Sequence, residues 1–165
     1  MAESWSEIER RVYANGRSFT NIAFDHLQDR NQIIRELRRA FSTSIKKGES
    51  AEQLINRVQK ITGKKASDAA RIVRTETTII ENTARQNAAN DYVKKTGKPV
   101  KKRWFCTFHN SRDSHKHMHN QTVRYDLPFH TPDGLPMMYP GDGRNVGPSE
   151  ICNCRCRMVI MNRGG

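Results

Sequence analysis

The placement of proline divides this chain into two unlike parts. The first 97 residues contain no proline, whereas five of the six prolines lie between residues 126 and 149, together with four glycines. Proline removes a backbone donor and clashes with the preceding turn of a helix, so long helices are compatible with the first part only. We therefore expect an α+β fold: N-terminal helices, one of them long, then a small C-terminal β unit with a long Pro/Gly loop.

Apolar spacing and capping residues predict the helices. Four apolar residues recur every fourth position and indicate a helix over residues 31–47: Ile33, Leu37, Phe41 and Ile45. A second helix is expected between a cap at Ser50 and a stop at Gly63. The third and longest is expected from a cap at Ser67 to about Lys95.

Three segments follow from these patterns. We expect an N-terminal helical arm at 1–30, a helical part at 31–97 and a C-terminal β unit at 98–165. Within the β unit the aromatic and β-branched content predicts strands at 100–109, 121–125 and 155–161, with a helical turn between 111 and 120.

The charge of the chain favours a polyanionic partner. Lys and Arg number 29 against 17 acidic residues, which gives a net charge of +12. Such a surplus most often indicates nucleic acid, and the run Lys101, Lys102 and Arg103 is the expected DNA contact. The alternatives are a charge that only aids solubility and an acidic protein partner. No stretch approaches the roughly 20 apolar residues of a membrane span, and the N-terminus lacks the apolar core of a signal peptide. We therefore expect neither membrane insertion nor secretion.

The cysteines and histidines gather in the last 60 residues. This region holds Cys106, Cys152, Cys154, Cys156, His109, His115, His117, His119 and His130. Clustered thiols and imidazoles suggest a metal before a disulfide. The C-x-C pattern, placed on a strand, would direct the sulfurs of Cys154 and Cys156 to one face, and His115 and His119 would share one face of a helix. The alternative is that the cysteines are small apolar core residues.

Two further motifs have competing interpretations. The His-rich stretch from His109 to Gln121 is also typical of a metal-dependent nuclease, in which an imidazole activates water. Against catalysis, no helix is expected to follow Asn120. The second motif is Arg74-Thr75-Glu76 in the long helix, which is either a solvated helix face or a polar anchor between the helices and the β unit.

The order of these motifs resembles the phage Mu F-like minor head proteins, also called phage head morphogenesis proteins. The resemblance spans residues 31–160 and rests on these segments: R-T-E at 74–76, K-K-R-W-F-C-T-F at 101–108, R-D-S-H at 112–115, N-Q at 120–121, P-F at 128–129, Y-P-G-D at 139–142 and N-C-R-C at 153–156. Each motif is weak alone, but their order is specific.

The resemblance implies which residues belong to the family's site. The motif positions fall on Arg74, Thr75, Glu76, Asp113, Gln121, Asn153 and Arg155. It leaves His115, Cys154 and Cys156 as inherited ligands of a possible Zn²⁺, with Cys106 able to supply a fourth. Cys152 and His119 are alternatives. Relatives often have C-x-x-C where this chain has Arg112 and His115, and a histidine where it has Ile151, so half of the usual ligand set is altered.

The resemblance also implies a function. We expect a non-enzymatic minor capsid protein of a tailed phage or prophage that acts at the portal in head assembly and in DNA packaging or ejection. Its partners would be portal or capsid proteins and double-stranded DNA, and its location the virion and, during assembly, the host cytoplasm. The alternative is a metal-dependent nuclease or phage-delivered toxin-like enzyme. Relatives usually have a longer N-terminal helical region, so the sequence fits either a short member or a fragment.

Overall fold

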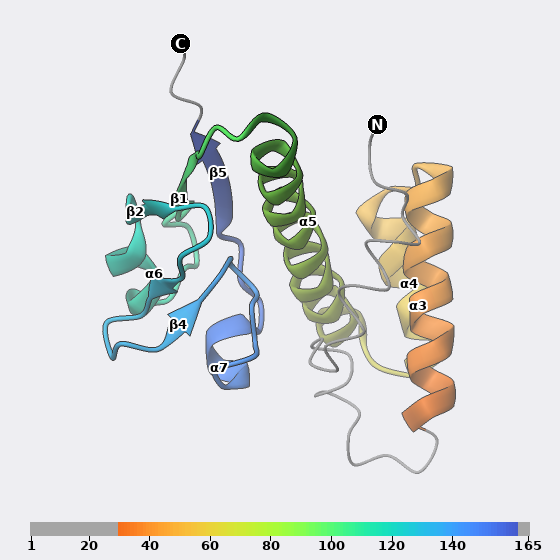
Figure 1. The fold of residues 1–165 in the computed structure, drawn as a ribbon. Helices are drawn as coiled ribbons and strands as arrows, with labels where there is room; N and C mark the ends of the chain where they lie inside the picture. Colours follow the sequence, from red (N-terminus) through yellow and green to blue (C-terminus); the bar gives the residue numbers. More distant parts are fainter. Residues whose placement is uncertain (1–29, 162–165) are drawn as a thin grey trace.

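Three helices and a small β unit make up the described part of the protein. A computed structural model describes residues 30–161. Helix α3 spans Arg30–Lys47, α4 spans Ala51–Thr62 and α5 spans Ala66–Thr96. In Figure 1, α5 lies between the α3–α4 pair and the β unit. The α+β class with one long helix is confirmed, and the helix expected within residues 1–29 lies outside the described residues.

The ends of α4 follow from its capping residues. The hydroxyl of Ser50 accepts a hydrogen bond from the backbone N–H of Gln53 at 3.2 Å, and the Gln53 side chain accepts from the N–H of Ser50 at 2.8 Å. This is the expected capping box. Gly63 ends the helix in the left-handed conformation, with φ of 67°.

The beginning of α5 differs from the prediction. The helix starts at Ala66, one residue before the expected Ser67 cap, and its N-cap is Lys65, whose side chain makes no cap bond. The carbonyl of Lys65 accepts the N–H groups of Asp68 and Ala69, so Ser67 lies inside the first turn.

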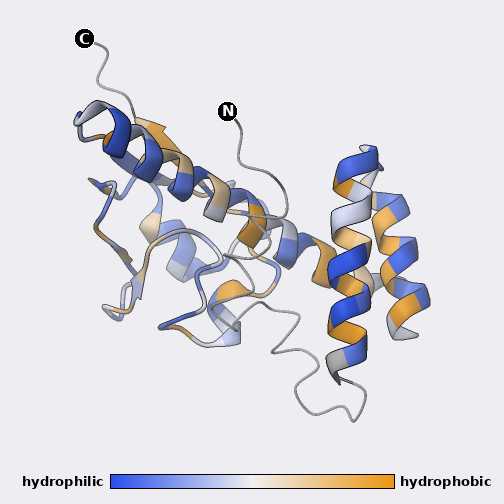
Figure 2. Ribbon diagram, turned by 45° about the vertical axis from the view of Figure 1, so that its right-hand side comes forward, coloured by the Kyte–Doolittle hydropathy of each residue, from blue (hydrophilic) through white to orange (hydrophobic). Residues whose placement is uncertain are grey.

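The helical part has its own apolar core. It is formed by the inner faces of the three helices and contains Leu37, Ala40, Phe41, Leu54, Val58, Ala69, Ile72, Val73, Ile79 and Ile80. Figure 2 shows that the apolar residues of α5 lie mainly toward α3 and α4, whereas its far end is largely polar. No helix in residues 30–161 has the length and apolar content that a bilayer crossing requires.

The β unit is built on a three-stranded antiparallel sheet in the order β2-β1-β5. The strands are β1 at Lys101–Phe105, β2 at Thr122–Arg124 and β5 at Arg157–Met161. All are shorter than predicted. Strand β1 stops before Phe108 and Asn110, whose φ angles of 62° and 53° are incompatible with extended backbone.

The remaining elements are short. Helix α6 spans Asp113–Met118, as the expected helical turn, and α7 spans Pro148–Ile151. The Pro/Gly stretch also contains a small hairpin in which β3, Phe129–His130, pairs with β4, Pro136–Met137. These elements close a second apolar core: Trp104, Cys106, Met118, Phe129, Met137, Val146, Ile151, Cys154, Cys156 and Met158.

Candidate metal centre and its support on the long helix

His115, Cys154 and Cys156 form a buried group at the centre of the β unit. His115 lies on α6, and the cysteines lie between α7 and β5. The Nδ1 atom of His115 is 3.5 Å from the sulfur of Cys154 and 3.4 Å from that of Cys156. The exposed fractions are 1%, 3% and 3%, so the group is closed to solvent.

A carboxylate holds the other side of the imidazole. The Nε2 atom of His115 is 3.0 Å from a carboxylate oxygen of Glu150 on α7. Arg112 lies beside the same pair and donates to the backbone carbonyl oxygens of Glu150, at 2.7 Å, and Cys152. Metal-bound histidines commonly donate their second ring N–H to a carboxylate, which fixes the tautomer and ring orientation. Here such a contact directs Nδ1 toward the two sulfurs.

The donor set and its spacing fit zinc. Zn–S bonds of about 2.3 Å and Zn–N bonds of about 2.0–2.1 Å in a tetrahedron separate sulfur from nitrogen by about 3.6 Å. The distances from His115 to the two sulfurs are 3.5 and 3.4 Å, and all three ligand atoms lie within 4.8 Å of one another. This group is therefore able to hold a metal, and its thiolate and imidazole donors favour a zinc-like ion.

The two thiols influence each other strongly. A hydrogen bond from Cys156, together with His115, lowers the pKa of the Cys154 thiol well below its ordinary value. The same hydrogen bond and burial raise the pKa of Cys156. The pair therefore favours a thiolate at Cys154 and a thiol at Cys156. A bound metal would stabilise both as thiolates, because metal binding releases the ligand protons.

The other proposed ligands do not join this group. Cys106 is buried in the same core, and its sulfur accepts the N–H of Phe108 at 3.3 Å. Its charge contributes to the raised pKa of Cys156, so it lies near the group. It is not among the ligand atoms that all lie within 4.8 Å of one another. His119 accepts the N–H of Cys106 at 3.1 Å through Nδ1. Cys152 packs against the helical core instead.

The long helix anchors the segment that carries the cysteines. Residues 152–156 are not part of a strand, contrary to the expectation for the C-x-C pattern, because Asn153 has a φ of 59°. The side chain of Asn153 accepts a hydrogen bond from Arg74, and its backbone N–H donates to the hydroxyl of Thr75 at 2.7 Å. Glu76, the third motif residue, is fully buried. The R-T-E motif thus contributes a polar anchor.

Two residues that sequence reasoning missed continue this anchor along α5. The hydroxyl of Thr78 donates to the carbonyl of Cys154 at 2.6 Å. Asn82 donates to the carbonyl of Cys156 at 3.2 Å and accepts the N–H of Met158 at 2.8 Å. Positions 75, 78 and 82 share one helix face, so a polar stripe at helical spacing was the available signal.

The three remaining motif residues, Asp113, Gln121 and Arg155, have separate contacts. Asp113 is exposed and pairs with Lys116 at 3.6 Å. The Gln121 amide donates to the carbonyl of His130 at 3.0 Å and accepts its N–H at 2.7 Å, which ties β3 to the start of β2. Arg155 is half-buried, and its charge adds to the effect of burial in lowering the pKa of Arg74.

One of the three predicted DNA contacts is wrong. Lys101 is exposed and Arg103 half-buried, but Lys102 is fully buried. Its ammonium donates to Gln86 at 2.8 Å and to the carbonyl of Met138 at 2.7 Å. Because residues of a strand alternate between faces, the middle residue of the basic run points into the core.

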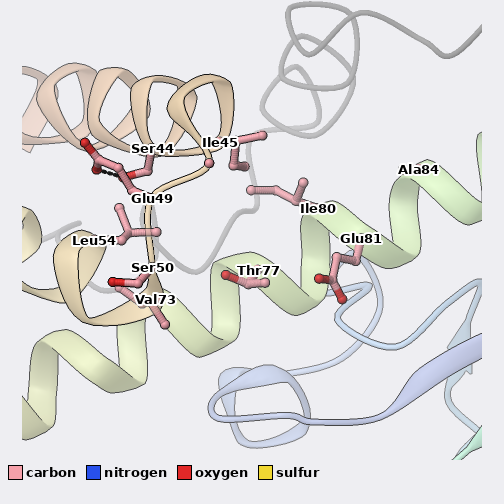
Figure 3. Close-up of a pocket in the computed structure, with 12 residues that line it drawn as sticks. Ser44, Ile45, Glu49, Ser50, Leu54, Val73, Thr77, Ile80, Glu81 and Ala84 are labelled. Carbon is pink, nitrogen blue, oxygen red and sulfur yellow. Dashed lines mark hydrogen bonds between the residues drawn. The ribbon is translucent and has the colours of Figure 1, made fainter.

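A separate apolar groove lies on the helical part. It has a volume of about 440 Å³ and runs between the α3–α4 connection and α5 (Figure 3). Ile45, Leu54, Val73 and Ile80 supply most of its apolar lining. Ile45 is 46% exposed, so part of this apolar surface faces solvent.

The chain was compared with known protein families, curated proteins and solved structures. A family model described as Phage Mu protein F like protein matches residues 35–159, a range that includes the anchor on α5 and the whole His/Cys group. No curated protein matches the chain, and no solved structure does.

Proposed function

Because this chain belongs to the phage Mu F-like family of head morphogenesis proteins, we propose that it is a minor capsid protein of a tailed phage or prophage, acting at the portal during head assembly and DNA packaging or ejection. Its location would be the virion, and the host cytoplasm during assembly. The family match over residues 35–159 is the observation that carries this proposal.

The His/Cys group supports a structural role in this function. His115, Cys154 and Cys156 would hold a zinc ion, which would cross-link α6 to the segment before β5. That segment is bonded to α5 through Thr75, Thr78 and Asn82. The group would therefore act as a clasp that fixes the β unit on the long helix, while the helices dock on portal or capsid proteins.

The geometry favours this role over the nuclease alternative. A nuclease would need an imidazole that reaches a phosphodiester, yet His115 is 1% exposed and faces sulfur and carboxylate groups. His119 uses its Nδ1 to accept the N–H of Cys106. The Nδ1 of the exposed His117 lies 2.8 Å from the backbone carbonyl of Asp113. We therefore propose that the chain is not an enzyme.

The apolar groove offers a place for the portal contact. Exposed apolar surface at Ile45 would bury against an apolar segment of the portal protein. In the phage or prophage that encodes this chain, Ile45→Asp should reduce co-purification with the portal protein at least tenfold. Leu127→Asp is the matched control, because Leu127 has a similar exposed fraction of 48% but lies in the β unit.

Purified heads test the proposal as a whole. Mass spectrometry of heads and virions should detect the chain at low copy relative to the major capsid protein, and deletion of its gene should reduce infectious particles. Absence of the chain from heads, together with normal particle yield after deletion, would falsify the proposed function.

A further inference from the structure

One face of the sheet β2-β1-β5 carries cationic side chains toward solvent. We call this side of the sheet the outer face. Its side chains come from all three strands: Lys101, Arg103, Phe105, Thr122, Arg124, Arg157, Val159 and Met161. The opposite side contains buried residues such as Lys102, Trp104 and Met158. Because side chains alternate along a strand, the three strands together place four cations on the outer face. They place no carboxylate there.

The register of the strands brings like charges together. Lys101 is directly opposite Arg124 in the β1–β2 pair. Like charges at such positions destabilise a sheet, and Asp126 offsets only the charge of Arg124, through contacts of 2.5 and 2.6 Å. Stability of the sheet therefore does not account for a cation at Lys101.

Two arginines are restrained by neutral groups. The Nε of Arg103 donates to the hydroxyl of Thr122 at 3.2 Å. The guanidinium of Arg157 lies 4.7 Å from the centre of the Phe105 ring. Neither arginine has an ion-pair partner among residues 30–161, so both side chains are positioned while their charge remains available.

We propose that the outer face binds the phosphate backbone of double-stranded DNA through Lys101, Arg103 and Arg157. Neighbouring strands are about 4.8 Å apart, so these cations spread over a flat surface that meets several phosphates. Contacts to phosphate oxygens position a protein on the duplex but carry no sequence information. Binding is therefore independent of sequence. The choice of DNA as the polyanion rests on the proposed function.

The test compares two triple variants of the full chain with the same loss of charge. The sheet variant is Lys101→Gln, Arg103→Gln and Arg157→Gln. The control variant is Arg35→Gln, Lys46→Gln and Lys47→Gln, three exposed positions on α3. Binding to a labelled DNA duplex is measured by fluorescence anisotropy at several salt concentrations.

The sheet variant should bind at least tenfold more weakly. The negative slope of log affinity against log salt should become less steep by about 2.7, which is about 0.9 for each phosphate that the variant no longer neutralises. The control variant should stay within about twofold of the wild type, because its charges lie away from the DNA. Equal weakening of both variants would show that only net charge matters and would overturn the proposal.

Two further measurements separate charge from folding. The charge-preserving variant Lys101→Arg, Arg103→Lys and Arg157→Lys should retain binding. Arg157→Gln alone should lower the salt slope by about 1, and an unchanged slope in that folded single variant would contradict the proposal. These assays use purified protein, so they are independent of incorporation into heads. A chain that binds DNA through this face but is absent from heads would refute only the proposed function.

Discussion

At the scale of single residues, Gly141 shows how closely the Pro/Gly loop approaches the long helix. Its φ is 93°, and a Cβ at this position would lie 2.8 Å from the Cγ1 atom of Ile79 and 3.2 Å from its Cα. Both the backbone conformation and the space require glycine at this position. The glycine of the Y-P-G-D motif is therefore explained by packing against α5.

Gly141→Ala should lower the free energy of unfolding by about 2–4 kcal/mol, because conformational strain and overpacking add. Gly134→Ala is the matched control. Gly134 also has a positive φ, of 83°, but a Cβ there would have no neighbouring atom within 4 Å. The control should cost about 1–2 kcal/mol, from backbone strain alone. Denaturant unfolding measures both, and equal losses would contradict the close approach.

Lys102 is a second residue whose role follows from burial. Burial lowers its pKa from 10.5 to about 8, although Asp142 and Asp126 partly oppose the shift. Phe129 lies below the ammonium, 5.1 Å from Nζ to the ring centre. The unfolded chain then binds more protons than the folded chain between about pH 8 and pH 10.5, so this residue makes stability rise with pH in that window.

The pH dependence is measured as a difference. Other groups titrate in the same window, so the unfolding free energy of the wild type is compared with that of Lys102→Met at each pH. From pH 8 to pH 10.5 the wild type should gain up to about 3 kcal/mol relative to the variant. Below pH 8 the difference should be constant. A difference that does not change with pH would show that Lys102 titrates normally.

At the scale of elements, α5 connects the helical core to the β unit. Its apolar face packs on α3 and α4, and its polar stripe binds the backbone of residues 153–158. Side-chain hydrogen bonds to buried backbone groups are directional, so they fix the position of this segment along the helix.

Asn82→Ala should destabilise the protein by about 2–3 kcal/mol, because the carbonyl of Cys156 and the N–H of Met158 would both lose a buried partner. Asn90→Ala is the control on the same helix. Asn90 is exposed and accepts one hydrogen bond from Gln86, which also donates to the carbonyl of Tyr125, so its loss should cost less than about 1 kcal/mol. Thermal unfolding of the two variants provides the comparison, and similar melting temperatures would argue against the anchor.

The sequence predicts the elements better than the interactions between them. Helical spacing and the Ser50 cap locate α3 and α4, because both signals are local. The start of α5 is mispredicted because a serine inside the first turn resembles a cap. The length of β1 is overestimated because a left-handed residue such as Phe108 is invisible in an apolar pattern.

The same distinction applies to the candidate site. Thiols and imidazoles are rare and chemically distinctive, so the sequence points to the Cys/His cluster, and the family resemblance narrows it to His115, Cys154 and Cys156. It does not identify Glu150 or Asn82, because their roles depend on a tertiary contact. Lys102 is wrongly predicted to lie on the surface, because the prediction treats the basic run as a unit and ignores that strand residues alternate between two faces.

At the scale of the whole molecule, the His/Cys group links distant parts of the chain. His115 is separated from Cys154 by 39 residues and from Cys156 by 41. The same segment is bonded to α5 more than 70 residues earlier. A metal held there would therefore act on the β unit and on its attachment to the helices, while the α3–α4 contacts contain none of its ligands.

Protein purified under reducing conditions should contain one zinc per chain. Cys154→Ser and Cys156→Ser should each lose it, whereas Cys152→Ser should retain it, because Cys152 lies against the helical core. Elemental analysis and thiol titration measure these outcomes. Absence of metal with four freely reactive thiols would exclude the metal centre.

Removal of zinc by a chelator should unfold the β unit before the helices. Binding to a structural site contributes on the order of 10 kcal/mol, which is lost on removal, since a preformed site rarely exists in the unfolded chain.

Trp104 reports the change, because its ring lies 5.2 Å from that of His115. In a Trp5→Phe background, chelation should shift Trp104 fluorescence to longer wavelength and leave much of the far-ultraviolet helical signal of α3, α4 and α5. Readdition of zinc should restore the fluorescence, and Cys154→Ser should show the shifted spectrum without chelator. A chelated protein in which Trp104 fluorescence and melting temperature are both unchanged would mean that the three side chains are held by packing and hydrogen bonds alone.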